Sequence, residues 1–133
     1  MPDETTTALT LVNSTAEVRL SLLATQLKRG RWQSPPPKQI GPGATAELSV
    51  VGSYFIDLKA AYARYGVERV VDGKWLGAGD LGLFVVNDRI SMPGHNPADS
   101  ISIALARLSV ASGLNYYDRY ELFILPNQNW RPS

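Results

Sequence analysis

The chain has 133 residues, no cysteine and a net charge of +1, from 13 basic and 12 acidic side chains. This balance lacks the basic excess that nucleic-acid binding requires, and the missing cysteines exclude disulfides and thiolate metal sites. The polar start lacks the features of a signal peptide, and no apolar run approaches the ~20 residues that span a bilayer, so we expect a protein that is soluble as made.

The first part of the chain predicts two strands. Residues 1–7 are polar and are expected to form a disordered tail. Residues 8–12 alternate in hydropathy, and the Asn-Ser-Thr segment at 13–15 favours a turn through its short polar side chains. Residues 17–27 form the second predicted strand, because apolar side chains recur at every second position of its first half.

A proline-rich connector, residues 30–43, separates this strand from the next predicted strand at 44–51. It contains three consecutive prolines at 35–37 and a Gly-Pro-Gly corner at 41–43. Proline fixes φ and lacks an N–H, so we expect an extended run, without helix or regular ladder, from one sheet of a β-sandwich to the other. Trp32 would project from this run. Its setting fits a binding role and a side chain tucked into the core equally well.

Residues 59–64 are open to two interpretations. Their alanine content allows two helical turns, whereas the β pattern on both sides favours a strand. In a strand, Ala61, Ala63 and Tyr65 would share one face, and Tyr62 would lie on the other. We therefore predict a strand here.

The segments after this strand show clear turn signals. Asp72-Gly73 predicts a two-residue hairpin turn, because both residues tolerate positive φ. The glycine-rich residues 77–80 are expected to form a loop. Residues 81–86 are nearly all apolar, which is typical of a buried central strand.

The last third continues the β pattern. Residues 92–97 are expected to form a loop, and residues 100–110 alternate with one change of phase that suggests a bulge. A turn at 112–113 leads to the last predicted strand at 120–125. The whole chain therefore predicts one all-β domain over residues 1–133, an antiparallel β-sandwich of about eight or nine short strands.

The residues offer no catalytic constellation, cofactor motif or metal site. His95 is the only histidine and lies in a predicted loop, so it is expected to be a solvated side chain. Two carboxylates could hydrolyse glycosides, but the acidic residues fall on outward strand positions or in turns. The sequence therefore predicts a protein that is not an enzyme and uses no cofactor or metal.

Aromatic side chains with cationic neighbours are the more informative feature. Tryptophan and tyrosine combine an apolar body with a polar group, which suits membrane interfaces and sugar rings, while nearby cations meet phosphate groups. The same residue types also favour strands and pack locally. The candidates for lipid contact are Trp32, Arg29, Arg31, Lys38, Trp75, Tyr116 and Tyr117.

The segment from Lys28 to Pro35, with Ile40 and a strand at 46–50 after it, resembles the aegerolysin family. The likeness is to its bacterial branch, the small component of two-component insecticidal crystal toxins. In that branch an early strand with an asparagine turn, here residues 11–15, precedes a Gly-Arg-Trp-x-x-Ser-Pro-like segment. The positions that match this segment are Gly30, Arg31, Trp32, Ser34 and Pro35.

The resemblance implies a β-sandwich without a catalytic centre that binds membrane lipid and forms pores with a larger partner protein. It also implies a protein made in the bacterial cytoplasm or in an inclusion body, without a signal peptide, that acts outside the cell on target membranes. Two other interpretations stay open. One is a lectin-like module in which Trp75 and the tyrosines stack on sugar rings, and the other is a self-associating domain that buries its aromatic residues in a homo-oligomer.

Overall fold

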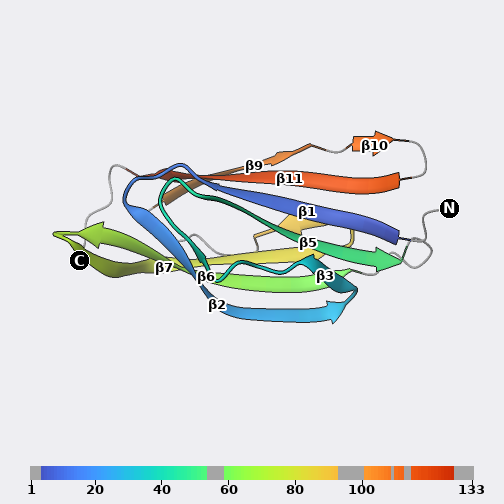
Figure 1. Ribbon diagram of the computed structural model, residues 1–133, viewed down its shortest axis with the longest axis horizontal. Helices are drawn as coiled ribbons and strands as arrows, with labels where there is room; N and C mark the ends of the chain where they lie inside the picture. The colour runs from blue at the N-terminus through green and yellow to red at the C-terminus, as the bar shows by residue number, and fades with distance from the viewer. Residues whose placement is uncertain (1–3, 54–58, 93–100, 109, 113–114, 128–133) are drawn as a thin grey trace.

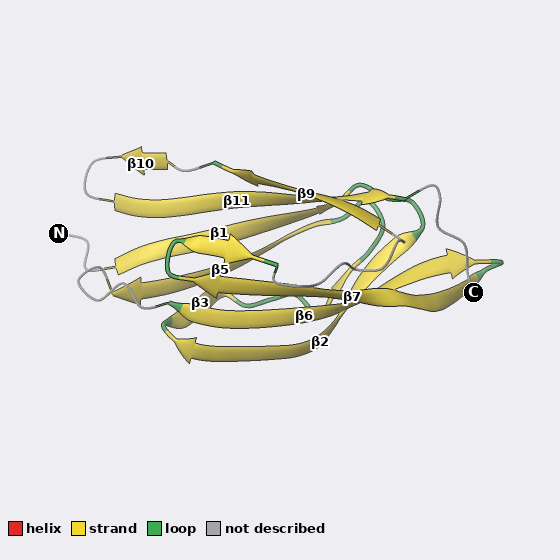
Figure 2. Ribbon diagram, turned by 180° about the vertical axis from the view of Figure 1, so that it is seen from behind, coloured by secondary structure: helices red, strands yellow, loops and turns green. Residues whose placement is uncertain are grey.

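The computed structural model describes residues 4–53, 59–92, 101–108, 110–112 and 115–127, with the backbone alone for 110–112 and 115–117. In these ranges all regular structure is β, and two sheets stack as a sandwich (Figure 1, Figure 2). The prediction of an all-β sandwich is confirmed. No helix in the described ranges could cross a bilayer.

The larger layer is named the six-stranded sheet, and its strand order is β10-β11-β1-β5-β3, with β9 also pairing to β11. Its pairs are antiparallel except that β1 lies parallel to β11. The strands of this sheet are β1 (Glu4–Asn13), β3 (Arg31–Ser34), β5 (Thr45–Ser53), β9 (Ile101–Arg107), β10 (Val110–Ser112) and β11 (Asn115–Pro126).

The second layer is named the five-stranded sheet, and its antiparallel order is β4-β2-β6-β7-β8. The described residues thus form more strands than the predicted number, because the shortest strands carry too few residues to show an alternation. The strands of this sheet are β2 (Val18–Arg29), β4 (Gln39–Ile40), β6 (Ala60–Val71), β7 (Lys74–Val86) and β8 (Arg89–Ser91).

The core lies between the two sheets and is filled by alternate side chains of each strand. Leu9 and Leu11 of β1 belong to the same hydrophobic cluster as Val18 and Leu20 of β2, and all four are fully buried. Burying one such side chain contributes about 1.5–3 kcal/mol. The period-two pattern read from residues 17–22 is therefore the pattern that forms the core.

The predicted tail is wrong for residues 4–7, because β1 begins at Glu4. Thr5 and Thr7 are buried, and Thr7 Oγ1 donates a hydrogen bond to Asn87 O at 2.8 Å. β5 and β11 pair with this segment on its two sides, so its backbone N–H and C=O groups form hydrogen bonds despite its polar composition. Residues 1–3 lie outside the described residues.

The connector passes between the sheets, as predicted. The chain leaves β2 in the five-stranded sheet, forms β3 in the six-stranded sheet, returns as β4 and then enters β5. The expectation of no ladder is correct for Pro35–Pro37 but wrong for β3 and β4, which pair with β5 and β2 on either side of the prolines. Tyr65 Oη donates to Pro37 O at 2.7 Å, which ties the connector to β6.

The middle strands differ in part from their prediction. β6 is a strand, and the Asp72-Gly73 turn has φ values of 52° and 78° as its hairpin requires. Residues 77–80 lie within β7 as a bulge rather than a loop, with Gly79 at a φ of 112°. Within residues 81–86 the side chains of Leu81, Leu83 and Val85 are buried, whereas Phe84 is half-buried and Val86 is exposed on the other face of the strand.

The C-terminal pattern is largely confirmed. The bulge predicted within residues 100–110 is wrong for the described residues: the ladder of β9 with β11 runs without a register shift through the change of phase at residues 105–107, β10 begins at Val110, and both strands pair with β11. β11 begins before the predicted strand and includes its residues 120–125. The loop predicted at 92–97, apart from residue 92, and residue 113 of the predicted turn lie outside the described residues.

Candidate functional site

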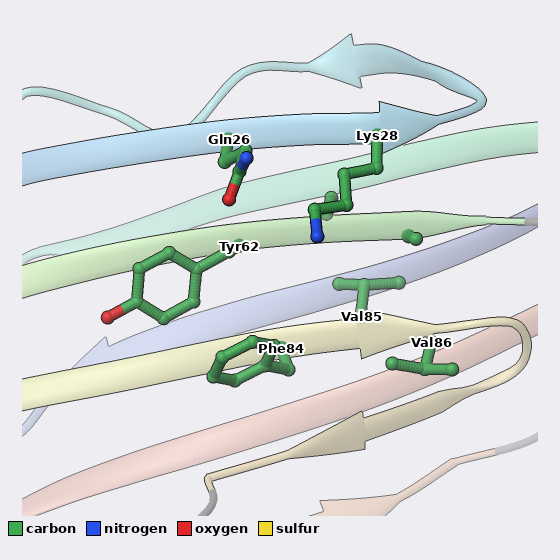
Figure 3. Close-up of a pocket in the computed structure, with 8 residues that line it drawn as sticks. Gln26, Lys28, Tyr62, Phe84, Val85 and Val86 are labelled. Carbon is green, nitrogen blue, oxygen red and sulfur yellow. The ribbon is translucent and has the colours of Figure 1, made fainter.

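A shallow groove lies on the outer face of the five-stranded sheet, over β2, β6 and β7 (Figure 3). Its volume is about 210 Å³. Its apolar floor and walls come from β6 and β7, and β2 supplies an amide and an ammonium group. The lining residues are Gln26, Lys28, Ala60, Ala61, Tyr62, Phe84, Val85 and Val86.

An aromatic pair forms the centre of this groove. Tyr62 and Phe84 lie directly opposite each other in the β6–β7 ladder, with ring centroids 4.4 Å apart and planes tilted by 45°. The tyrosine ring lies beside Gly82, where a Cβ would be 3.6 Å from Tyr62 Cε1 and Oη, an ordinary van der Waals distance. Both rings are half-buried, so each keeps one part of its surface available to a ligand.

Two cationic residues, Lys28 and Arg29, lie at the end of β2 beside the groove. A register shift between Leu27 and Arg29 places Lys28 in a bulge, and Figure 3 shows its side chain pointing from β2 toward β6. Lys28 and Arg29 are exposed, and neither forms an ion pair within the described part of the chain. Their positive charge is therefore uncompensated beside an aromatic surface.

Most of the predicted site residues lie at the end of the sandwich where β2 ends and where β1, β3 and β11 begin (Figure 1). Arg29 ends β2 and Arg31 begins β3, where Arg31 Nη2 lies 2.9 Å from Glu4 Oε2. This hydrogen bond lowers the pKa of Glu4 and raises that of Arg31. Tyr116 and Tyr117 pair through their backbone with the start of β1 at the same end.

The predicted projection of Trp32 is wrong. Its side chain is half-buried and packs against the core, and its ladder partner Val50 is fully buried. β3 is the edge strand of its sheet, so the indole covers the border of the core there. Of the two roles expected for this side chain, packing against the core is observed, and contact with lipid stays a prediction.

The other candidates lie elsewhere. Lys38 is exposed beside the middle of β2, where Leu22 N donates to its carbonyl oxygen at 2.8 Å. Trp75 lies next to the β6–β7 hairpin turn, at the opposite end of the molecule from the groove (Figure 1). His95, which was expected to be a solvated loop residue, lies outside the described residues.

No pattern in the sequence groups Tyr62 with Phe84 and Lys28. The signal for Tyr62 was present, since alternation placed it opposite Ala61 and Ala63 and hence on the outer face. Its proximity to Phe84 depends on the β6–β7 register across a bulge, which alternation within one strand does not contain.

A second cluster of side chains lies on the same outer face, nearer the hairpin turn. Arg19 contacts Glu68 through two hydrogen bonds, from Nε to Oε1 at 3.1 Å and from Nη2 to Oε2 at 3.3 Å. Ser21 Oγ also donates to Glu68 Oε1 at 2.8 Å. The Arg19 guanidinium carbon lies 4.3 Å from the centroid of the Trp75 ring. These contacts join β2, β6 and β7.

Glu68 makes the stability of this cluster depend on pH. The hydrogen bonds from Arg19 and then Ser21 lower the pKa of the Glu68 carboxyl in the folded state. The ionised group therefore stabilises the fold above its unfolded pKa of about 4.3, and this contribution is lost as pH falls through the lower folded pKa.

We expect Glu68→Gln to reduce the free energy of unfolding by about 1 kcal/mol at pH 7 and much less near pH 3. Thermal unfolding across this range measures the difference, with the exposed Glu47→Gln as control. A deficit that stays constant with pH would contradict the assignment.

Comparison with known proteins places the fold. No family model and no curated protein matches the sequence. Among solved structures, the chain is similar to RahU protein, whose crystal structure was determined in complex with a TRIS molecule. The TM-score is 0.56 at 11% sequence identity, and the alignment covers 97% of this chain and 98% of that chain. The likeness at this identity concerns the fold.

Proposed function

We propose that this chain, whose sandwich has the aegerolysin-like fold of RahU, is a non-enzymatic protein that binds lipid head groups at a membrane surface. The groove of Tyr62, Phe84 and Lys28 on the five-stranded sheet is the proposed contact. In the finer form of the proposal, the chain is the small component of a bacterial pore-forming, insecticidal toxin and acts with a larger partner protein. The sequence resemblance is the support for that finer form.

The observation that carries the proposal is the apolar part of the outer face at the groove, beside cations that have no ion-pair partner in the described residues. The outer face of a sandwich sheet is normally polar, because it faces water. Here it carries the half-buried rings of Tyr62 and Phe84, and the side chains of Leu23 and Val86 are 53% and 49% exposed. This apolar part of the outer face, together with the neighbouring cations, is the surface that we propose for the contact.

The chemistry of the groove fits the interface of a phospholipid layer. Phosphate oxygens would meet the ammonium group of Lys28 and the guanidinium of Arg29, which have no carboxylate partner in the described residues. The rings of Tyr62 and Phe84 would lie among the apolar parts of the head-group region, where aromatic side chains are favoured. Neither contact requires a reaction, which is consistent with a binding protein.

Sedimentation with vesicles of mixed phosphatidylcholine and phosphatidylserine tests this proposal. We expect Lys28→Gln to weaken binding about fivefold, because one cation near an anionic surface contributes about 1 kcal/mol. Phe84→Ala should weaken binding about tenfold through the loss of apolar contact. Binding should also fall at high salt as the charges are screened.

Matched variants at the opposite end serve as controls. Lys74 and Leu76 are exposed beside the hairpin turn, so Lys74→Gln and Leu76→Ala remove the same kinds of group far from the groove. Equal losses in the two sets would show that the groove is not the contact. Vesicle binding that is unchanged in both groove variants would refute the proposal.

A further inference from the structure

We infer that a second surface on the five-stranded sheet binds a neutral saccharide. This surface, the polar row, consists of Gln39, Ser21, Arg19, Glu68 and Trp75, and it crosses the outer face from β4 to β7. The inference does not rest on the lipid-binding proposal, because the polar row shares no residue with the groove.

The hydrogen-bonding groups of the polar row are held in place before any ligand arrives. Glu68 binds the Arg19 guanidinium through both carboxylate oxygens, and the Trp75 ring lies 4.3 Å from its central carbon. Ser21 Oγ donates to Glu68 and accepts from Gln39 Nε2 at 3.4 Å. Side chains restrained in this way lose little entropy when they bind a ligand.

Several donors and acceptors of this array remain unused within the described residues. Arg19 bonds to Glu68 through Nε and Nη2, which leaves the N–H groups on Nη1. The Trp75 indole N–H and the Gln39 amide oxygen have no hydrogen-bond partner in the described ranges. Sugar hydroxyl groups both donate and accept, so they are suitable partners for each of these groups.

Charge decides between a saccharide and a phosphate. The positive charge of Arg19 is matched by Glu68 at hydrogen-bond distance, so the polar row has no excess charge to attract an anion. The groove differs, since Lys28 has no such partner in the described part of the chain. A half-buried tryptophan ring beside hydrogen-bonding side chains therefore favours a neutral, hydroxyl-rich ligand here.

The polar row and the groove are separate along the sheet. Tyr62 and Glu68 lie on the same strand, β6, six residues apart, which corresponds to about 20 Å at the usual rise of a strand. A monosaccharide on one surface would leave the other free. Changes in one surface should therefore not alter binding at the other.

Proton–nitrogen NMR of the full chain tests the inference. The probes are methyl α-mannopyranoside, methyl β-galactopyranoside and N-acetylglucosamine, each added to about 50 mM, which detects a millimolar Kd. We expect at least one of them to shift the Trp75 indole N–H and the Arg19 Nε–H, while the Trp32 indole signal stays in place. The Trp75 signal is identified by its loss in Trp75→Phe.

Two variants and one competing probe complete the test. Arg19→Lys keeps the charge but loses the planar guanidinium, so it should weaken sugar binding about fivefold or more. Glu47→Gln on the other sheet should leave sugar binding unchanged, and the spectrum of each variant reports whether its own fold is intact. No shift with any of the three sugars would overturn the inference, as would a larger shift of the same signals with inorganic phosphate. Either result leaves the vesicle experiment unaffected, so the two proposals fail independently.

Discussion

Replacing Gly30 with alanine is expected to destabilise the protein by about 3 kcal/mol or more. Gly30 joins β2 to β3, where the chain changes sheets, and its φ is +86°. A residue with a side chain pays about 1–2 kcal/mol for this left-handed conformation. A Cβ would also lie 2.6 Å from Val51 O, a backbone atom that cannot move without disturbing β5.

Variants of two other glycines in the connector distinguish the cost of the left-handed φ from the cost of the contact with Val51 O. Gly43 has a φ of +73°, and no atom lies within 4 Å of the place that a Cβ would take, so Gly43→Ala should cost only about 1 kcal/mol. Gly41 has neither constraint, and Gly41→Ala should stay within about 0.5 kcal/mol of the parent. Urea unfolding of the three variants measures the order. Similar losses for Gly30→Ala and Gly43→Ala would show that the contact with Val51 has no effect.

Replacing Asn13 with alanine is expected to cost about 3–4 kcal/mol, because its buried amide serves several backbone groups at once. Nδ2 donates to Val18 O at 2.8 Å and to Gly41 O at 2.9 Å. Oδ1 accepts from Thr15 N at 3.2 Å and from Thr15 Oγ1 at 2.7 Å. Since Asn13 is 1% exposed, water cannot replace these partners.

The same turn supplies the control for Asn13. Ser14 is exposed, so Ser14→Ala should change the free energy of unfolding by no more than about 0.5 kcal/mol. The loss in Asn13→Ala should lower the thermal midpoint by about 10 °C in a domain of this size. A decrease as small as that of Ser14→Ala would mean that the four hydrogen bonds contribute nothing net to stability.

For Asn13, the neighbouring residues predict the turn but not its long-range hydrogen bond. Its residue type and its neighbours Ser14 and Thr15 predicted a turn, and the chain does turn there. The bond to Gly41, 28 residues away, anchors the Gly-Pro-Gly corner and depends on how the connector folds back. No pattern within 13–15 contains that information.

In the candidate site, too, the sequence pattern and the folded structure each account for different features. Trp32 and its basic neighbours stood out by composition, yet the structure turns the indole toward the core and leaves Lys28 and Arg29 at the surface. The aromatic pair of Tyr62 and Phe84 comes from two strands whose outward positions are individually unremarkable. Their contact follows from the register of β6 and β7.

Alternating hydropathy, the proline run and the Asp-Gly turn were enough to predict an all-β sandwich, the passage of the connector between sheets and the β6–β7 hairpin. These are properties of consecutive residues, because the period of a strand and the φ limits of proline and glycine act locally. The parallel pairing of β1 with β11, the strand status of residues 4–7 and the meeting of Tyr62 with Phe84 emerged only in the folded molecule. Pairing and register join residues far apart in the chain, and it is the shared core between the two sheets that selects them.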